Sequence, residues 1–300
     1  MKKVIIVATF LISLINNINA QGCSDAGFCS VGNTFKGETD LKNSFEIGTV
    51  YGVGEKDVTL FSPYLIYTRN FSKSFGLSTK LTFNIANGSF GTRAALGDIF
   101  VTGSYKFNTS QYDKFKWSSI FGLKIPLTSG NDKINNVSLP MPYQASLGTF
   151  DIIAGLDLAV KKWEFNTAIQ IPLNTNKNSY LKELAPTDNF VSTNLFERRP
   201  DALFRTAYKF KTSNQKFTFK PNVLFIYHLG TDKFVNVFGQ KEEIKKSDGL
   251  TINGNLIASY KLSNNNSFEA SIAAPFLVRE VRPDGLTRAF TFGLSYKRNF

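Results

Sequence analysis

Segments of about ten residues in which apolar and polar positions alternate recur along most of the chain. In one of them an apolar series at 75, 77, 81, 83 and 85 alternates with Gly76, Ser78, Lys80, Thr82 and Asn84. A period of two is the pattern of a β-strand whose faces meet different surroundings. Strands are expected near residues 45–53, 57–69, 75–85, 99–107, 115–125, 150–160, 163–171, 204–210, 217–227, 250–260, 268–276 and 290–300, with 57–69 ambiguous in phase. No stretch of useful length has the period of a helix, so the pattern predicts an all-β protein of about 12 strands.

The connections between these segments differ in length according to their parity. Counted from the first strand, the even-numbered connections are short and polar, at 70–74, 108–114, 161–162, 211–216 and 263–267. Three odd-numbered ones are long, at 128–148, 174–200 and 230–248. Short periplasmic turns and longer extracellular loops are typical of a transmembrane antiparallel up-and-down β-barrel. A soluble β-sandwich or a secreted adhesin would also alternate, but it has no reason to sort its loops in this way. We therefore expect residues 45–300 to form an outer-membrane β-barrel.

The first 20 residues have the layout of a secretory signal peptide. Lys2 and Lys3 precede an apolar run at 4–15, and the small residue Ala20 follows. This predicts export, with cleavage after Ala20 and a final location in the bacterial outer membrane. A lipoprotein with Cys23 acylated is a weaker alternative, because residues 20–22 match a lipid-attachment box poorly. Beyond this segment no apolar run reaches the length of about 18 residues that a transmembrane helix needs.

Residues 21–44 precede the first expected strand and contain the only cysteines, Cys23 and Cys29. In an exported chain a close pair is most simply a disulfide, since a metal site would need further ligands nearby. This periplasmic N-terminal segment could plug the barrel or hang below it, and the sequence does not choose between the two.

The net charge limits the classes of partner that we expect for the protein. The chain carries a formal charge of +12, and removal of Lys2 and Lys3 with the signal peptide leaves 12 − 2 = +10. A positive protein can bind nucleic acid, an anionic membrane surface, or simply water. Export disfavours nucleic acid, so we expect outer-membrane lipid and lipopolysaccharide, the barrel-assembly machinery and a small-molecule solute as partners. The chain ends on Phe300, which resembles the C-terminal aromatic assembly signal of such barrels, although Arg298 departs from that pattern.

In a membrane barrel the apolar half of each strand meets lipid and the polar half faces the interior. The candidate interior residues are Lys80, Asp98, Phe100, Lys124, Asp151, Asp157, Gln170, Arg205, Asn253 and Asn255. Apolar residues such as Leu203, Leu224 and Leu277 share this face. Such a mixed lining suits small, partly apolar solutes better than bulk ions. Alternatively, the interior charges pair with one another and hold the barrel rigid.

Three prolines, Pro126, Pro172 and Pro275, fall on interior positions at the outer ends of strands. Each removes a backbone donor, so each is expected to end strand pairing at the rim. The alternative is that the missing donors open the wall sideways and give an apolar solute an exit into lipid.

Catalytic and metal-binding patterns are lacking, and neither an enzyme nor a cofactor is expected. The single histidine, His228, lies near the outer end of the ninth strand, with no serine or acid placed by spacing to partner it, and is expected to be a rim residue. Asp151 and Asp157 share one strand face about 20 Å apart by strand rise, too far for acid/base catalysis.

Several segments resemble a family of bacterial outer-membrane barrels associated with the MetA pathway of phenol degradation, which is distantly similar to FadL-kind channels. ALGDIFVTGSYKF at 95–107 resembles the family's Gly-Asp strand, and GLKIPLTSG at 122–130 its next element, with Leu127 as an interruption. FDIIAGLDLA at 150–159 and the last hairpin at 274–300 are similar to the following parts. The resemblance implies an outer-membrane transporter of hydrophobic or aromatic solutes by passive diffusion. The alternative is a structural or surface-interaction barrel that acts through its extracellular loops, whose charged residues include Lys133, Lys177, Lys182, Glu183, Arg198, Arg199 and Lys233.

Overall fold

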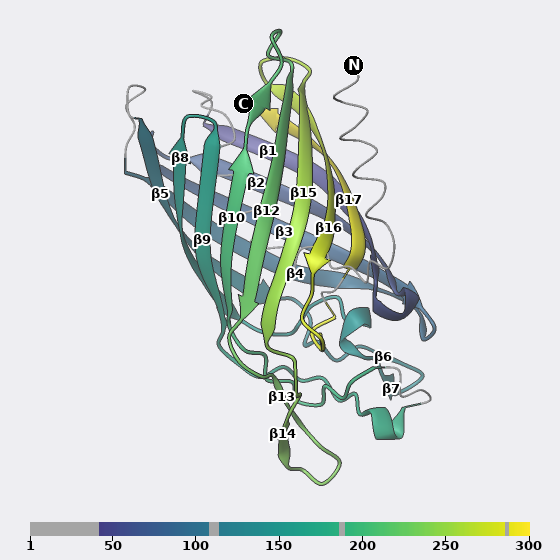
Figure 1. Ribbon diagram of the computed structural model, residues 1–300. Coiled ribbons are helices and arrows are strands. Elements are labelled where there is room, and N and C mark those ends of the chain that lie inside the picture. Colours follow the sequence, from purple (N-terminus) through teal and green to yellow (C-terminus); the bar gives the residue numbers. More distant parts are fainter. Residues whose placement is uncertain (1–41, 108–113, 186–189, 286–287) are drawn as a thin grey trace, which may run out of the picture.

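The computed structural model describes residues 42–107, 114–185, 190–285 and 288–300 (Figure 1). The expected signal peptide, the Cys23–Cys29 pair and nearly all of the segment 21–44 lie outside the described residues. Twelve long strands form one closed antiparallel sheet, which confirms the predicted barrel. They are β1 (Asn43–Gly54), β2 (Thr59–Asn70), β3 (Phe75–Gly88), β4 (Gly91–Lys106), β5 (Phe115–Pro126), β8 (Asp151–Val160), β9 (Trp163–Pro172), β10 (Asp201–Tyr208), β12 (Phe217–His228), β15 (Gly249–Lys261), β16 (Asn266–Leu277) and β17 (Arg288–Asn299).

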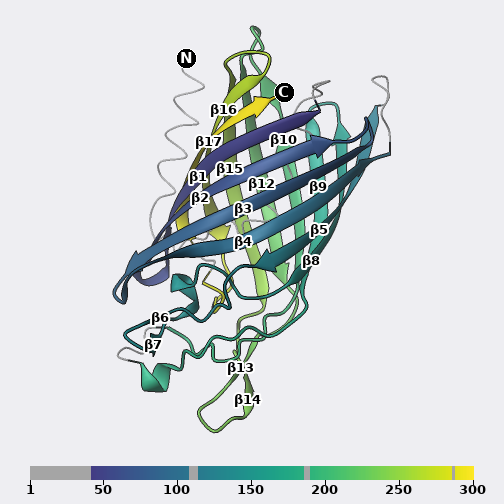
Figure 2. The ribbon, with the colours of Figure 1, turned by 180° about the vertical axis from the view of Figure 1, so that it is seen from behind.

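The barrel closes by pairing its first and last strands. Each long strand pairs with its neighbours in sequence, β1 pairs with β17, and the short β11 (Phe210–Lys211) continues β10 against β12. Asn43 and Phe300 exchange backbone hydrogen bonds of 2.9 Å in both directions. Closure gives every long strand a partner on both sides, which is the condition for a sheet in hydrocarbon. The strands are tilted across the barrel wall, as both views show (Figures 1 and 2).

The two faces of the wall differ as the alternation predicts. Large apolar side chains such as Phe75, Phe121 and Phe268 are exposed on the outside. The ambiguous segment 57–69 also resolves, because Phe61 and Leu65 are exposed while Ser62 is buried and Tyr64 donates its hydroxyl to Glu46 inside the barrel. Among the described residues no helix is long and apolar enough to span a membrane.

A bulge near the end of β16 changes one prediction. Asn253 of β15 pairs with Pro275, whereas the next residue toward the long loops, Ile252, pairs with Leu277, so β16 holds one extra residue there. The extra residue turns Leu277 outward, where it is 47% exposed, so its expected interior position is wrong. Pairing between β16 and β17 also stops at Ala273–Thr291, short of the ends of both strands.

The connections follow the predicted parity. The described turns at 71–74, 161–162, 212–216 and 262–265 are short, and lie at one end of the barrel. The long connections contain small elements that the alternation does not reveal. These are β6 (Lys133–Ile134), β7 (Val137–Ser138), η2 (Met141–Tyr143), η3 (Lys182–Leu184), β13 (Lys233–Val235) and β14 (Lys241–Glu243), with η1 (Glu55–Asp57) between β1 and β2.

The long loops pack into a body of their own, here called the loop cap: the described residues of 127–150, 173–200, 229–248 and 278–285. Its apolar core joins Leu139, Tyr143, Tyr180 and Phe190 to Val58 and Ala86 on the barrel rim. Contacts among buried aromatic rings and small apolar groups hold a loop in one conformation. The cap therefore has a defined position over one mouth of the barrel.

Candidate functional site

The interior of the barrel is where the sequence places its functional residues. Nine of the ten candidate interior residues are buried, and Asn255 is half-buried. They come from the six neighbouring strands β3, β4, β5, β8, β9 and β10 and from β15, so the closed sheet brings together residues up to 175 positions apart (255 − 80).

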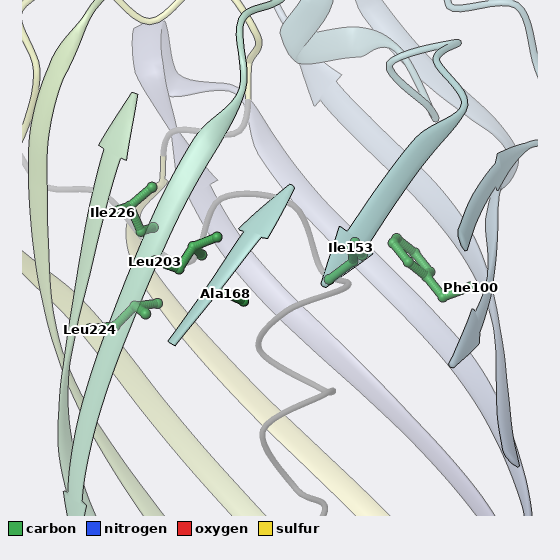
Figure 3. Close-up of a cluster of buried hydrophobic side chains, with 6 residues drawn as sticks. All are labelled: Phe100, Ile153, Ala168, Leu203, Leu224 and Ile226. Atoms are coloured by element: carbon green, nitrogen blue, oxygen red, sulfur yellow. The ribbon is translucent and has the colours of Figure 1, made fainter. Parts of the chain in front are cut away.

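A cluster of buried apolar side chains lies along part of the inner wall. It consists of six buried residues, here called the apolar belt, which Figure 3 shows: Phe100, Ile153, Ala168, Leu203, Leu224 and Ile226. Register places them side by side, since Leu203 pairs with both Ala168 and Ile226. Gly122 on β5, which pairs with Ile153, adds no side chain to the inner wall at that position. The belt gives the interior an apolar face where a water-filled pore needs a polar one.

The charged residues beside the belt are paired with one another. The ammonium of Lys124 lies 3.0 Å from the carboxylate of Asp151, and both side chains are fully buried. That carboxylate also accepts from the hydroxyl of Thr149 at 2.6 Å and from the amide of Gln170 at 2.6 Å. A buried charge needs this number of partners to offset the loss of water.

A second interior network lies nearer the short-turn end. Asp157 accepts from the amide of Asn166, whose carbonyl oxygen accepts from Nε of Arg205 at 2.8 Å. The ammonium of Lys220 donates to Glu164 at 2.6 Å. These contacts correspond to the alternative in which interior charges pair and hold the barrel rigid.

The loop cap reaches into the mouth of the barrel. Ser146 donates its hydroxyl to Asp98, and the side-chain amide of Asn84 donates to the backbone oxygen of Ala145. A Cβ on Gly97 would lie 2.9 Å from that same oxygen, so only glycine allows the loop to come this close. Deeper in the barrel, the ammonium of the candidate residue Lys80 lies 4.6 Å from the centroid of the Tyr64 ring. The cap is thus held at the mouth by direct contacts with the barrel wall.

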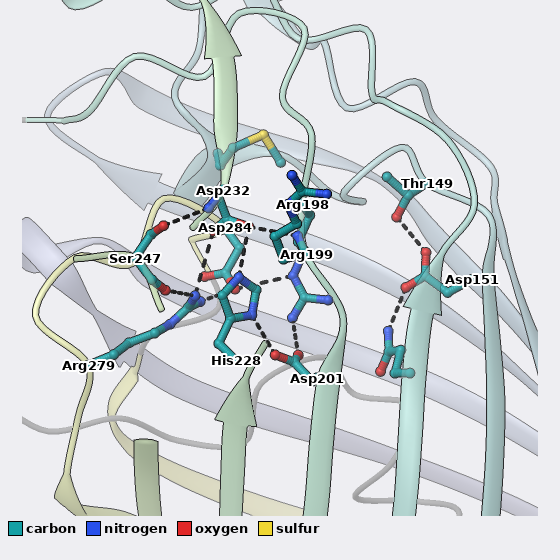
Figure 4. A network of polar contacts seen from close by, with 12 residues as sticks. Thr149, Asp151, Arg198, Arg199, Asp201, His228, Asp232, Ser247, Arg279 and Asp284 are labelled. Carbon is teal, nitrogen blue, oxygen red and sulfur yellow. Dashed lines mark hydrogen bonds and ion pairs between the residues drawn. The ribbon is translucent and has the colours of Figure 1, made fainter. Parts of the chain in front are cut away.

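Six buried charged side chains join the loops of the cap to the strand ends, and are here called the mouth cluster (Figure 4). They are Arg198, Asp201, His228, Asp232, Arg279 and Asp284. The cluster draws on three of the long connections and on the ends of β10 and β12.

His228 is at the centre of this cluster. Its Nδ1 lies 2.6 Å from Oδ1 of Asp201 and its Nε2 lies 2.8 Å from Oδ1 of Asp232. Only the imidazolium form donates from both nitrogens. The expectation that no acid partners His228 is wrong, because spacing along the chain does not reveal the pairing. The signal lies in the register: Asp201 begins β10 and faces His228 at the end of β12.

The two arginines complete the cluster. Arg198 donates to Asp201 and, at 3.4 Å, to Asp284. Arg279 donates to Asp284 and to the backbone oxygen of Ser247 at 2.6 Å. With His228 protonated the cluster holds three cations and three carboxylates, so its charges cancel. Burial by itself raises the pKa of Asp284, but Arg279 and Arg198 outweigh burial and hold that pKa below its usual value.

This arrangement joins the loops to the strand ends through buried ion pairs and hydrogen bonds. Both nitrogens of His228 are occupied by carboxylates, so the ring cannot take a proton from a nucleophile. Among the described residues no group of His, Cys, Asp or Glu is arranged to hold a metal ion.

Pro126 ends β5 at a point where no partner needs its missing donor. The next residue, Leu127, donates to Gly97 on β4 at 3.1 Å. Successive backbone N–H groups point to opposite neighbours, so the nitrogen of Pro126 is on the β8 side. The ladder with β8 has already ended at Lys124–Asp151.

Pro172 ends β9 in the same way. Leu173 donates to Phe150 on the β8 side at 2.7 Å, and the ladder with β10 has ended at Gln170–Asp201. Both positions agree with prolines that end strand pairing at the rim.

Comparisons with known proteins support the fold. Neither models of known protein families nor curated protein sequences match this chain. Among solved structures, the COG4313 outer membrane channel from Pseudomonas putida F1 has a TM-score of 0.62 at 11% identity, covering 88% of this chain and 97% of that one. The translocator domain of the autotransporter NalP from Neisseria meningitidis has a TM-score of 0.52 at 10% identity, covering 90% and 92%.

The chain therefore has the fold of bacterial outer-membrane β-barrels. Its likeness to a channel and to a translocator domain at such low identity is a likeness of fold alone. The MetA-pathway resemblance has no further support from these comparisons and stays a prediction.

Proposed function

We propose that this protein is an outer-membrane channel through which small hydrophobic or amphipathic solutes diffuse passively. The observation that carries the proposal is the apolar belt inside a closed barrel. An apolar inner wall lowers the free energy of a poorly water-soluble solute and makes no favourable interaction with a hydrated ion. The interior charges next to the belt are engaged with one another, which makes them poor ligands for ions in transit.

The location and partners follow from the same proposal. The apolar outer face fits outer-membrane lipid, and the loop cap, with exposed Lys241 and Lys246, would face lipopolysaccharide. Phe300 would be the residue that the barrel-assembly machinery recognises, and no cofactor takes part. A solute would enter past the loop cap and pass along the belt.

Uptake by whole cells tests this function, because apolar solutes cross pure lipid bilayers unaided while the lipopolysaccharide leaflet of living cells resists them. Cells that lack their own hydrophobic-solute channel should accumulate a radiolabelled aromatic or alkyl solute faster when they make this protein. Leu203→Gln, which puts an amide of similar size into the belt, should reduce that uptake, and Lys241→Gln in β14 should not.

Two results would contradict the proposal. One is an uptake equal to that of cells with an empty vector while the barrel is folded in the outer membrane, as its heat-modifiable gel mobility reports. The other is a large, steady ion conductance in planar bilayers without any uptake of apolar solutes, which would make the protein an ion-permeable porin.

A surface-interaction barrel is the second candidate, and one hairpin favours it. β13 and β14 project from the loop cap (Figure 1), and Phe238 at their turn is 84% exposed. Arg198, which the sequence suggested as a contact residue, is buried in the mouth cluster and is not available to a partner. Replacing 236–240 by a two-residue Asn-Gly turn should leave uptake unchanged under the channel proposal. Loss of a cell-surface function with normal uptake would favour the second candidate.

A further inference from the structure

The inner face of β15 carries hydrogen-bonding groups that the protein does not use. Asn253 is fully buried, and within the described part of the chain neither Nδ2 nor Oδ1 of its amide has a hydrogen-bond partner. Two residues along the strand, Oδ1 of Asn255 is also unpaired, while its Nδ2 donates to Asn222 on β12 at 2.9 Å. The side chain of Asn253 has no surface exposed to bulk water. Unpaired buried amides are costly and rare, and polar groups at membrane depth mark solute pathways.

The neighbouring strands explain why this amide is unpaired. Asn253 lies in register with Leu224 on one side and with Pro275 on the other. Neither side chain can donate or accept a hydrogen bond. The wall therefore sets a polar group between two apolar neighbours, where leucine or valine would pack at lower cost.

The unpaired amide also lies at one end of the apolar belt. Leu224, its direct neighbour, is a belt residue, and the belt continues from there through Leu203 and Ala168 toward Phe100. An apolar cluster that ends in an unsatisfied donor and acceptor has the two kinds of group that an amphipathic molecule needs.

We propose that Asn253 and Asn255 bind the uncharged hydroxyl head group of a solute whose apolar body lies along the apolar belt. The inference rests on the proposed function and names its solute class. The free groups are one amide NH₂ and two carbonyl oxygens. A hydroxyl donates to one carbonyl and accepts from the NH₂, so it uses both kinds of group.

Other head groups fit this wall less well. A carboxylate has no proton to donate and would face two carbonyl oxygens. A hydrocarbon or an alkyl halide would leave the amide of Asn253 as unpaired as before. The solute must take the place of the side chains that cover this amide, and the amide gains two hydrogen bonds in the exchange.

The test uses the full-length protein in lipid nanodiscs with nitrogen-15-labelled asparagine. Asn253→Leu, which is close in volume, identifies the side-chain resonance by its loss. Octanol, octanoate and chlorooctane are titrated at neutral pH, and binding is followed by the asparagine side-chain signals and by the shift in thermal unfolding. Octanol should move the Asn253 signal and bind roughly fivefold to 150-fold more tightly than chlorooctane, the ordinary net value of two neutral hydrogen bonds.

The variants separate the head-group site from the channel. Asn253→Leu should remove the preference for octanol over chlorooctane, whereas Ser271→Ala, which removes an inward polar group from β16, should keep it. An equal preference in the wild type and in Asn253→Leu overturns the inference, and so does tighter binding of octanoate than of octanol. If cells take up apolar solutes but Asn253 does not affect binding, the site falls and the channel stands. If none of the three solutes binds and cells take up none, both proposals fall.

Discussion

Replacing His228 by leucine should open the loop cap. In the wild type the imidazolium donates to Asp201 and Asp232, and it balances the third carboxylate of the mouth cluster. His228→Leu removes one of three cations and leaves a net charge of −1 in a buried site. It also removes the histidine donor from Oδ1 of Asp201 and from Oδ1 of Asp232, which keeps the backbone N–H of Arg199 as a donor.

The magnitude follows from the burial of the cluster. Removal of one partner from a buried ion pair costs about 3–5 kcal/mol, because the remaining charge is left uncompensated. Arg198 and Arg279 still contact the carboxylates, so we take the lower limit. If the cap opens and closes faster than a protease cleaves, about 3 kcal/mol makes opening roughly 100-fold more frequent.

Limited trypsin digestion of the membrane-embedded protein measures this opening. Lys246 is exposed, while the next residue, Ser247, is buried and holds Arg279 through its backbone oxygen. Cleavage after Lys246 should therefore follow release of the segment from the cluster. Gel mobility shows in parallel whether the barrel itself stays folded.

A charge-matched double variant provides the control. His228→Leu combined with Asp232→Asn removes one cation and one anion, so the buried charges cancel again. The asparagine keeps the oxygen that accepts from the backbone of Arg199 at 2.8 Å in the wild type. Protease resistance should return in large part. A cleavage rate in His228→Leu equal to that of the wild type would refute the role given to charge balance, and so would a double variant as sensitive as the single one.

Three further predictions concern the cap and the rim. Arg279 lowers the pKa of Asp284, so the contribution of this carboxylate to stability is complete above the ordinary aspartate pKa of about 3.9 and is lost as pH falls through the lowered pKa. Digestion with an acid protease should therefore show an intact cap at pH 4 and an open cap only in stronger acid. Opening near pH 6 would contradict this prediction. Gly148 has φ +70°, and a Cβ there would lie 2.2 Å from the backbone oxygen of Ser129. Gly148→Ala should therefore lower the stability of the cap by at least about 1 kcal/mol and expose the loop 127–150 to trypsin. Resistance equal to that of the wild type would show that the turn can rearrange. Pro126→Ala and Pro172→Ala should change the free energy of unfolding by no more than about 0.5 kcal/mol in a thermal unfolding experiment and leave uptake unchanged, because no partner strand faces the restored N–H. Reduced uptake in either variant would favour a sideways exit through the wall.

The sequence alone determined the barrel and the faces of its strands. Alternation with period two tells each side chain which side of a sheet it occupies, and membrane and interior demand opposite polarity on the two sides. Loop length sorted by parity then distinguished the two ends. This local information places Lys124, Asp151 and Asn253 inside without any knowledge of their partners. It failed at Leu277, where one extra residue in β16 reverses the alternation.

Only the tertiary structure decided which inner residues meet. Ring closure and register set His228 between Asp201 and Asp232, bring Phe100 into line with Leu224, and leave Asn253 between apolar neighbours. None of these pairs follows from spacing, because each depends on the offset between strands and on loops of irregular conformation that carry no periodic signal. The sequence predicted a lined barrel, and the fold decided that its charges are paired, that its mouth is held by a balanced cluster, and that one amide is left for a solute.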